Sequence, residues 1–489
     1  MSQIQINNLN FIYPGQTEYI FKNVNLTLDT DWKLGLIGRN GSGKTTLLKL
    51  LLGEYESNNA ISKNIEFEYF PYEIKNENDL TINIAYKILP NLEEWRLYKE
   101  LNLIKMDANI LYRNFSTLSG GEMIKFLLIC AFLKENKFLL IDEPTNHIDE
   151  ESKDSLIEYL KQKKGFILVS HDRKILNEVV DHILYIGKQN ITLEQGTYNS
   201  WKFNKTNRDN NEIEQNKRLK NDIMKLDEIA KKTENWSNAV EKSKKGAVDK
   251  GHVGHQAAKM MKRAKVLESR RDKKIEEKTG LLKDIDILPD LQMKPLIASR
   301  KNLILVQNLS IFYDKKILFK NLNFEINSGE RVAIEGKNGS GKSSIVKLIV
   351  GENIPNNKGL KVMPNLKISY VSQMTDEVKG TISEYARYNN VDEGIFRAML
   401  QKLGVDKEKL DTNLSDLSEG QKKKVMIARS ISEDSEIYIW DEPLNYLDIQ
   451  SREQIENMIL KYEPTMLFIE HDNVFINKIA TKVIQLPEE

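Results

Sequence analysis

The sequence predicts an α/β fold in which two similar domains are joined by a long antiparallel α-helical hairpin. Three observations support this prediction: a set of motifs that occurs twice, strand-like and helix-like stretches that alternate within each half, and a charged, proline-free segment between the halves. Alternating strands and helices are typical of α/β domains, and a repeat that spans a whole half indicates a duplicated domain.

Four motifs carry the duplication. The glycine-rich stretch 38–46 recurs at 336–344, and Leu-Ser-Gly-Gly-Glu at 118–122 recurs as Leu-Ser-Glu-Gly-Gln at 417–421. Asp-Glu-Pro at 142–144 recurs at 441–443, and His-Asp at 171–172 recurs at 471–472. Equivalent positions lie 298 to 300 residues apart, so whole domains correspond.

Each half opens with a strand-like stretch, at residues 4–13 and 303–313. A second strand follows, at 32–37 and 331–335, and leads into the glycine-rich loop and an apolar helix. We therefore expect domains at 1–202 and 300–489, joined by a linker at 203–299.

The linker is predicted to form two helices, because its apolar residues recur three or four positions apart on either side of a glycine-punctuated tip at 242–256. A helix of some 35 residues would reach roughly 50 Å from the domains. Residues 202–278 contain 22 lysines and arginines but only 13 aspartates and glutamates, whereas the whole chain carries a net charge of only +1. A basic hairpin suits RNA phosphates, although a solvated coiled-coil spacer is the alternative. The candidate RNA-facing tip residues are Lys242, Lys244, Lys245, Lys250, His252 and His255.

Composition excludes several classes of protein. The apolar stretches are too short to span a bilayer, and the N-terminus carries no secretory signal, so we expect a cytoplasmic protein without a membrane partner. The single cysteine, Cys130, rules out an internal disulfide and a zinc site of several thiolates. Cys130 lies in an apolar run and is expected to be a core residue.

The glycine-rich loops match the pattern G-x-x-x-x-G-K-[S/T], in which backbone N–H groups surround phosphates and a lysine reaches the outer ones. We therefore expect ATP and Mg²⁺ as cofactors. Thr45 and Ser343 offer hydroxyl groups to the metal. The phosphate-binding candidates are Gly38, Asn40, Gly41, Ser42, Gly43, Lys44, Thr45 and Thr46 in the first loop, and Gly336, Asn338, Gly339, Ser340, Gly341, Lys342, Ser343 and Ser344 in the second.

Two acids end a buried strand in each half. We expect Asp142 and Asp441 to serve Mg²⁺, and Glu143 and Glu442 to polarise the attacking water. The alternative is that these acids only cap the helix that follows.

Further candidates are a histidine and a tyrosine in each half. His171 and His471 each follow a strand and could contact the γ-phosphate. Tyr13 and Tyr313 precede their loops, where each ring could stack on adenine or be part of the core.

This combination of glycine loop, Leu-Ser-x-Gly-[Glu/Gln], acid pair and late histidine resembles the ATP-binding-cassette superfamily. The resemblance implies two cassettes that pair head to tail within a monomer, with each ATP closed by the other cassette's signature. Lys44 would then share a site with Ser418 and Gly420, and Lys342 would share one with Ser119, Gly120 and Gly121.

The chain departs from the superfamily pattern at two positions. The expected metal-contacting glutamine is Gln373 in the second half, but Tyr72 stands at its place in the first half. The second signature has Glu419 where the first has Gly120, and we expect its carboxylate near the γ-phosphate of the Lys44 site. Both changes fall on one composite site, so the two ATP sites are predicted to be unequal.

The order of domains, with a basic helical linker between two cassettes, resembles that of the ABC-F family of translation factors. The distance from the loop lysine to the signature serine is 75 residues in the first half and 76 in the second, so nothing is inserted in the first cassette relative to the second. This compact layout resembles the antibiotic-resistance branch of the family, of the Lsa and Vga types. The resemblance implies binding at the exit site of the ribosomal large subunit, contact with ribosomal RNA and with the peptidyl-site tRNA, and protection against lincosamides, pleuromutilins and streptogramin A. The alternatives are a housekeeping ABC-F translation factor and, from another class, the ATPase subunit of a transporter.

Overall fold

The computed structural model describes the 489-residue chain except residues 1, 16–17, 57, 59, 62–64, 146–147, 188–190, 314–315, 338, 358, 488–489, and 244–288 apart from 262, 266, 269 and 273. The side chains of 226–227, 229–243, 313, 316 and 408 are also outside the description. Packing divides the chain into two compact units, one of residues 1–198 with 288–489 and one of residues 199–287.

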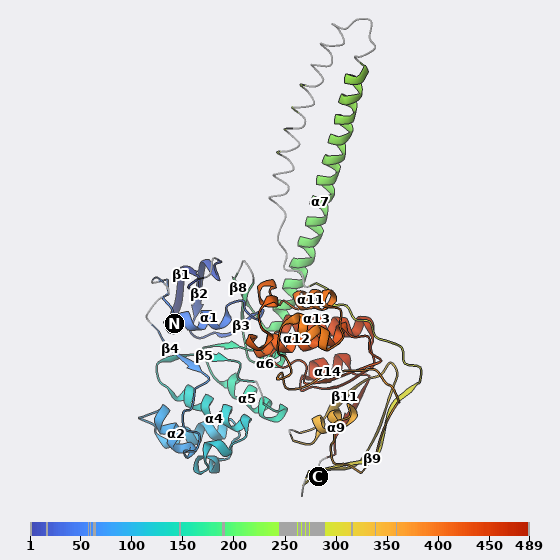
Figure 1. Ribbon diagram of the computed structural model, residues 1–489. Helices are drawn as coiled ribbons and strands as arrows, with labels where there is room; N and C mark the ends of the chain where they lie inside the picture. The colour runs from blue at the N-terminus through green and yellow to red at the C-terminus, as the bar shows by residue number, and fades with distance from the viewer. Residues whose placement is uncertain are drawn as a thin grey trace. The chain divides into compact units, whose positions relative to one another are not determined.

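The first unit contains both duplicated domains, each of which has α/β architecture as predicted (Figure 1). In the first domain, a six-stranded sheet has the order β4-β5-β6-β3-β7-β8, and β1 pairs with β2 in a separate antiparallel sheet. The elements of this domain are β1 Gln3–Phe11, β2 Phe21–Asp29, β3 Lys33–Gly38, α1 Lys44–Leu52, β4 Glu66–Phe70, α2 Thr81–Ile88, α3 Glu94–Leu103, η1 Ala108–Tyr112, η2 Phe115–Thr117, α4 Gly120–Leu133, β5 Lys137–Asp142, α5 Glu150–Gln162, β6 Phe166–Val169, α6 Arg173–Glu178, β7 His182–Ile186 and β8 Ile191–Gln195.

The second domain repeats this plan with a five-stranded sheet of order β13-β14-β15-β11-β16 and a three-stranded sheet of order β10-β9-β12. Its elements are β9 Asn302–Tyr313, β10 Lys316–Asn327, β11 Arg331–Glu335, α9 Lys342–Ile349, β12 Leu360–Val362, β13 Ile368–Val371, α10 Ile382–Tyr388, α11 Glu393–Lys402, η4 Lys407–Asp411, η5 Leu414–Asp416, α12 Glu419–Ser432, β14 Ile437–Asp441, α13 Ile449–Tyr462, β15 Met466–Ile469, α14 Asn473–Ile479 and β16 Lys482–Gln485.

The central strands of each sheet run parallel, so the residues that follow them gather at one edge. In the first domain β5 pairs with β6, and β6 neighbours β3, all in parallel. The glycine-rich loop follows β3, the acid pair ends β5, and His171 follows β6. Ligands of open α/β sheets bind at this carboxyl edge, so the topology assembles the predicted site.

The strand β14 shows how the core is divided between the two faces of the second sheet. Tyr438 and Trp440 pack in the cluster that contains α12, whereas Ile437 and Ile439 pack in the cluster that contains α9. All four side chains are fully buried, because a parallel sheet is covered on both faces. The glycine-loop helix and the signature helix therefore lie on opposite faces of one sheet.

The second unit includes α7 Tyr198–Ser243, a 46-residue helix that matches the first predicted helix of the linker (Figure 1). The second predicted helix and most of the tip lie outside the described residues. Residues 288–299 were expected to belong to the linker, but Leu291 and Met293 are buried in the core of the second domain. No helix in the described part of the chain is long and apolar enough to cross a membrane.

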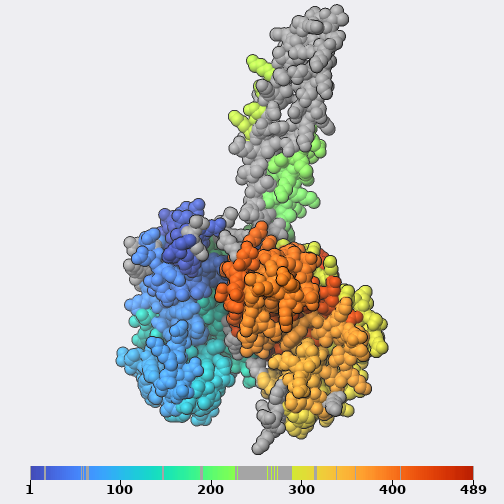
Figure 2. Space-filling view, in the orientation of Figure 1, coloured from blue at the N-terminus to red at the C-terminus, as the bar shows by residue number. Residues whose placement is uncertain are grey.

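Figure 2 shows the described surface of the first domain in blue to cyan and of the second in yellow to red. Cys130 lies beneath that surface as a free thiol, fully buried in α4. Burial raises the pKa of this thiol to about 12, so the expectation of a core residue is confirmed.

Candidate functional site

The two glycine-rich loops have the same geometry. Lys44 Nζ donates to the carbonyl oxygens of Gly38 at 2.9 Å and Arg39 at 3.1 Å. Lys342 Nζ donates to Gly336 at 2.7 Å and Lys337 at 3.0 Å. Each ammonium group is thus held over its loop.

The helix after each loop begins at a glycine in the left-handed region, with φ 99° at Gly43 and 98° at Gly341. A Cβ atom at Gly43 would lie 2.7 Å from the Ile20 side chain, so the turn requires glycine. In each domain, this turn directs the first backbone N–H groups of the helix that follows, α1 or α9, toward one point beside its loop. Such an arrangement binds anions.

The metal-ligand candidates meet beside the loops. Thr45 Oγ1 donates to Asp142 Oδ2 at 3.4 Å. In the second domain, burial raises the pKa of Asp441 to about 6, against a hydrogen bond from Ser343 that lowers it. Hydroxyl and carboxylate therefore lie together at both loops, as the sequence predicts.

The catalytic candidates Glu143 and Glu442 share a strained backbone. Their φ angles are 49° and 47°, in a region that non-glycine residues seldom adopt. The two histidines face them, with His171 Nε2 3.4 Å from Glu143 Oε1 and His471 Nε2 3.6 Å from Glu442 Oε1. The same strain and the same partner in both domains indicate a shared role.

The surroundings of the two glutamates differ. Glu442 Oε2 accepts hydrogen bonds from Gln373 Nε2 at 2.9 Å and Asn445 Nδ2 at 2.6 Å. Burial would raise the pKa of Glu442, but hydrogen bonds from His471, Gln373 and Asn445 outweigh it and lower the pKa.

Glu143 accepts a longer hydrogen bond, 3.3 Å, from the backbone N–H of His171. Burial, with Asp142 adjacent, raises the pKa of Glu143 to about 8. Burial also lowers the pKa of His171 well below its usual range, and the Lys44 and Arg452 charges add to this. The two sites are therefore electrostatically unequal.

Tyr72 does not replace the glutamine in the structure. Its ring lies over Lys134 Nζ, 4.9 Å from the centroid, and edge-on to Phe70. Tyr69, three positions earlier, instead donates from its hydroxyl to Asp142 Oδ2 at 3.0 Å. Tyr69 was not among the predicted site residues, although the alternation of side chains along β4 separates it from its neighbours and was the signal that could have identified it.

Tyr13 lies beside the first loop, where its hydroxyl and Thr46 Oγ1 are 2.8 Å apart. Its ring contacts Phe11 and Tyr55 edge to face. Stacking of adenine on Tyr13 stays a prediction. The side chain of Tyr313, the residue Asn338 and the tip residues lie outside the description.

Each signature begins a helix. Ser119 and Ser418 are the N-caps of α4 and α12, each in a reciprocal capping box with the residue three positions later. For Glu419, the expected position near the γ-phosphate stays a prediction. Its carboxylate accepts from the Thr375 hydroxyl and lies 3.2 Å from Lys422 Nζ, both in its own domain.

The second signature lies against the first glycine-rich loop. A Cβ atom on Gly420 would be 3.1 Å from Asn40 Nδ2 and 2.6 Å from the Tyr446 carbonyl oxygen. That carbonyl accepts from Asn40 Nδ2 at 3.1 Å, and Arg39 Nε donates to Gln450 Oε1 at 2.7 Å. These contacts place Gly420 beside the Lys44 loop, as head-to-tail pairing requires.

At the other loop, a cavity of about 420 Å³ opens between the domains. It is lined by Lys342, Ser343, Gln373, Glu442 and His471 from the second domain, and by Glu143 and His171 among others from the first.

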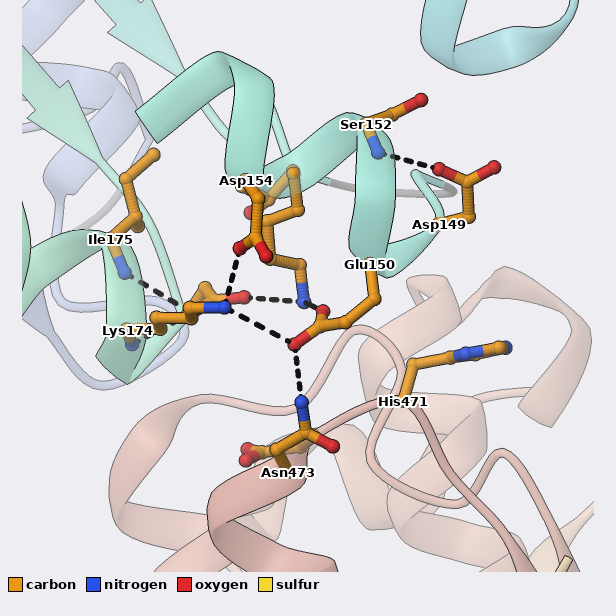
Figure 3. Close-up of polar contacts among 12 residues, drawn as sticks. Asp149, Glu150, Ser152, Asp154, Lys174, Ile175, His471 and Asn473 are labelled. Atoms are coloured by element: carbon orange, nitrogen blue, oxygen red, sulfur yellow. Dashed lines mark hydrogen bonds and ion pairs between the residues drawn. The ribbon is translucent and has the colours of Figure 1, made fainter. Parts of the chain in front are cut away.

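A polar cluster beside this cavity joins α5 to α14, as Figure 3 shows. Glu150 Oε1 accepts from Asn473 Nδ2 at 2.7 Å, and its carboxylate lies 3.0 Å from Lys153 Nζ. The two domains therefore meet through polar contacts on both sides of their interface.

The residues present fit a magnesium nucleotide. In the described part of the chain, Ser42 Oγ, Ser340 Oγ and Asp441 Oδ1 are buried and have no hydrogen-bond partner. Buried polar atoms of this kind require a partner, and all three lie at the loops where phosphate oxygens and a hydrated cation would bind. Mg²⁺ takes few protein ligands when phosphates supply the rest, in keeping with the absence, among the described residues, of a cluster of three or more metal-binding side chains.

Fold and site together define an ATPase with two P-loop domains. The sequence profile of the ABC transporter family matches residues 21–146 and 319–445, one stretch in each domain. The chain therefore belongs to this family of ATP-binding-cassette proteins. We call the two domains cassettes from here on.

Individual relatives match over almost the whole chain. The ribosome protection protein VmlR of Bacillus subtilis is 29% identical over 480 residues, covering 96% of this chain and 84% of VmlR. The ATP-binding protein Uup of Buchnera aphidicola (subsp. Schizaphis graminum) is 28% identical and covers 95% of this chain and 77% of Uup.

Among solved structures, the archaeal ribosome recycling factor aABCE1, crystallised with the ribosomal stalk protein aP1, aligns with a TM-score of 0.62 at 19% identity. The alignment covers 99% of this chain and 88% of that one. At this identity the likeness establishes the fold.

Proposed function

We propose that this ATPase binds the ribosome and protects it against antibiotics of the peptidyl-transferase centre. The similarity to VmlR, which is named as a ribosome protection protein, supports this proposal because it runs through both cassettes and the linker. The single observation that carries it is the long basic helical segment between two ATPase cassettes.

The shape and charge of α7 suit RNA. A helix of 46 residues is about 69 Å long at 1.5 Å per residue. Among its described cationic side chains, Arg208, Lys217, Arg218, Lys220 and Lys225 are exposed. Lysine and arginine along an extended element release counterions from RNA phosphates, which gives an affinity that falls with salt. We infer that the hairpin enters the exit site of the large subunit, with its tip residues near ribosomal RNA and the peptidyl-site tRNA.

ATP would control this docking. Lys44 and Lys342 would hold the phosphates, and Mg²⁺, held by Thr45 with Asp142 and by Ser343 with Asp441 and Gln373, would neutralise charge on them. Glu143 and Glu442 would each orient and polarise a water, with His171 and His471 at the γ-phosphate. Closed cassettes would bind the ribosome, and hydrolysis would release the protein into the cytoplasm.

Drug susceptibility tests the proposal. The chain would be expressed in a drug-sensitive bacterial strain, and inhibitory concentrations measured for a lincosamide, a pleuromutilin and streptogramin A. We expect increases with the wild type and none with the Glu143→Gln, Glu442→Gln double variant. Unchanged susceptibility to all three drugs with the wild type would contradict the resistance proposal.

The second candidate is a housekeeping role on the ribosome, because similarity of the same extent to Uup, which is named only as an ATP-binding protein, does not favour resistance over it. That role predicts slower growth or translation on deletion of the gene without drugs. ATP-dependent co-sedimentation with ribosomes is common to both candidates, and its absence would favour a transporter ATPase instead.

The tip has its own test. Replacing Lys244 and Lys245 by glutamine should weaken ribosome binding and reduce the slope of log affinity against log salt by roughly one to two. Replacing Lys217 and Lys220, which lie on α7 well before the tip, serves as the charge-matched control. Equal effects of the two pairs would show that the tip has no special role.

A further inference from the structure

Lys423 is a buried ammonium group that the ATP chemistry described above does not use. It lies in the signature helix α12, and its side chain is fully buried. Its Nζ donates to the backbone carbonyl oxygens of Ser372 at 2.9 Å, Gln373 at 3.4 Å and Asp441 at 3.2 Å. An ammonium group has three N–H donors, so these three carbonyls use its full capacity.

A second contact joins the same helix to the same loop. The Thr375 hydroxyl, which is nearly buried, donates to a carboxylate oxygen of Glu419, the first residue of α12. Loop 372–375 is therefore attached to the signature helix at two points, one turn apart along the helix. We call Lys423, Glu419 and Thr375 the signature tie.

The first cassette has no such tie. Ile124 stands in place of Lys423 and Gly120 in place of Glu419, each 299 residues earlier. Ile74 stands in place of Thr375, 301 residues earlier, which is the offset between Tyr72 and Gln373. None of these side chains has a polar atom, so none can make the corresponding hydrogen bond. Among the residues that the structure describes, these hydrogen bonds are therefore confined to the second cassette.

The two ends of the tie touch different ATP sites. At the loop end, Gln373 donates to Glu442, beside Lys342. At the helix end, Gly420 lies against Asn40 of the Lys44 loop. A shift of Gln373 would displace the carbonyl groups that hold Lys423, and with them the helix that presents the second signature to the other site.

We propose that the signature tie couples the two ATP sites in one direction. Nucleotide in the Lys342 site positions Gln373, and through Lys423 and Glu419 this positions the second signature for turnover at the Lys44 site. Lys423, Glu419 and Thr375 are positioning residues in this scheme. The inference depends on the ATPase activity and on the contacts above, and it goes beyond the proposed action on the ribosome.

A mutant cycle on the full-length chain without ribosomes tests the coupling. All proteins carry Glu442→Gln, which silences hydrolysis at the Lys342 site, so steady-state turnover reports the Lys44 site. One change is Lys342→Ala, which weakens nucleotide binding at the second site. The other is the double exchange Glu419→Gly, Lys423→Ile, which introduces the residues of the first signature.

With the tie intact, we expect Lys342→Ala to lower kcat at the Lys44 site at least tenfold, within the usual range of coupling between sites. With the exchanged signature, the same change should alter kcat less than about twofold, because occupancy of the second site no longer reaches the helix. The ratio of the two effects cancels any direct loss from the altered signature.

Single variants keep the test independent of folding. Thr375→Val preserves the shape of the side chain and removes one hydrogen bond, so it should reduce the coupling. Glu419→Gln retains an acceptor for the Thr375 hydroxyl, so this variant should keep most of the coupling. Ile124→Val in the first cassette is the control and should leave the coupling unchanged.

Three outcomes would overturn the proposal. The first is an equal effect of Lys342→Ala with intact and exchanged signatures. The second is no effect of Lys342→Ala when the tie is intact. The third is full coupling in Thr375→Val together with full coupling in the double exchange. Failure of drug protection in cells would leave this result untouched, because the assay contains no ribosomes.

Discussion

The buried ion pair of Asp448 and Lys424 allows a sharp prediction, because the first cassette supplies a matched control. Asp448 Oδ2 lies 2.9 Å from Lys424 Nζ, and the two side chains are only 2% and 4% exposed. Asp448 also caps α13 by accepting from Ser451 N–H at 2.8 Å. Asp448→Asn preserves the cap but leaves a buried ammonium group without its anion, which costs about 3–5 kcal/mol.

Asp149 is the equivalent residue and caps α5 through Ser152 N–H at 2.8 Å (Figure 3). The lysine equivalent to Lys424 is Lys125, whose Nζ bonds to Ser155 Oγ at 3.3 Å instead. Asp149→Asn should therefore cost less than about 1 kcal/mol.

Native-state hydrogen exchange measures both variants locally, which suits a chain with two cassettes. We expect protection of the α13 amides to fall by roughly 10²- to 10⁴-fold in Asp448→Asn, and protection of the α5 amides to change less than about fivefold in Asp149→Asn. Equal changes in the two helices, or a loss under about 1 kcal/mol at α13, would refute the reasoning.

The same pair predicts an acid dependence. Burial would raise the pKa of Asp448, but Lys424 and the Ser451 N–H outweigh it and lower the pKa. A carboxylate whose folded pKa is lowered contributes stability above its unfolded pKa of about 3.9, and this contribution is lost as pH falls below that value. The stability difference between wild type and Asp448→Asn should therefore be constant near neutral pH and shrink below about pH 4. A difference that grows with acid would contradict the sign.

Three further predictions concern the ATP sites. Glu442→Gln should reduce ATP turnover more than Glu143→Gln, by at least about threefold, because Gln373 donates to Glu442, whereas Tyr72, at the matching position of the first cassette, lies against Lys134. Equal losses would contradict the inequality of the sites. Gly420→Ala should lower turnover at the Lys44 site roughly tenfold or more, since its Cβ would collide with the Tyr446 carbonyl 2.6 Å away, and a steady-state assay in the Glu442→Gln background measures this. Tyr69→Phe removes the hydrogen bond to Asp142 and should raise the Mg²⁺ concentration needed for half-maximal turnover severalfold; an unchanged magnesium titration would show that this hydroxyl does not position the metal ligand.

Much of each site was predictable, because each of its parts is a short motif of residues that are close together in the sequence. A glycine loop after a strand, an acid pair at the end of a strand and a histidine after a third strand are local patterns. Parallel pairing of these strands then brings the residues to one sheet edge, and the structure places Lys44, Asp142 and His171 there. The long helix α7 followed likewise from spacing and the absence of proline.

The directions of single side chains were not predictable in this way. The Glu419 carboxylate was expected near the γ-phosphate of the Lys44 site, and its hydrogen bond from Thr375, 44 residues earlier in the chain, was not predicted. Tyr72 occupies the glutamine's place in sequence, yet the tyrosine whose hydroxyl contacts Asp142, a metal-ligand candidate, is Tyr69, three positions earlier in β4. Such partners depend on which face of a strand a residue occupies and on what packs against that face.

The sequence by itself thus determined the duplicated α/β domains, the phosphate loops, the acids and the basic helix, because each depends on residues a few positions apart. Only the tertiary structure decided that Gly420 lies against Asn40, that Gln373 donates to Glu442, and that Lys423 joins one signature to its loop. These contacts link residues far apart in the chain, and they form only where folding removes both partners from water and leaves each a single geometry in which its hydrogen bonds are satisfied.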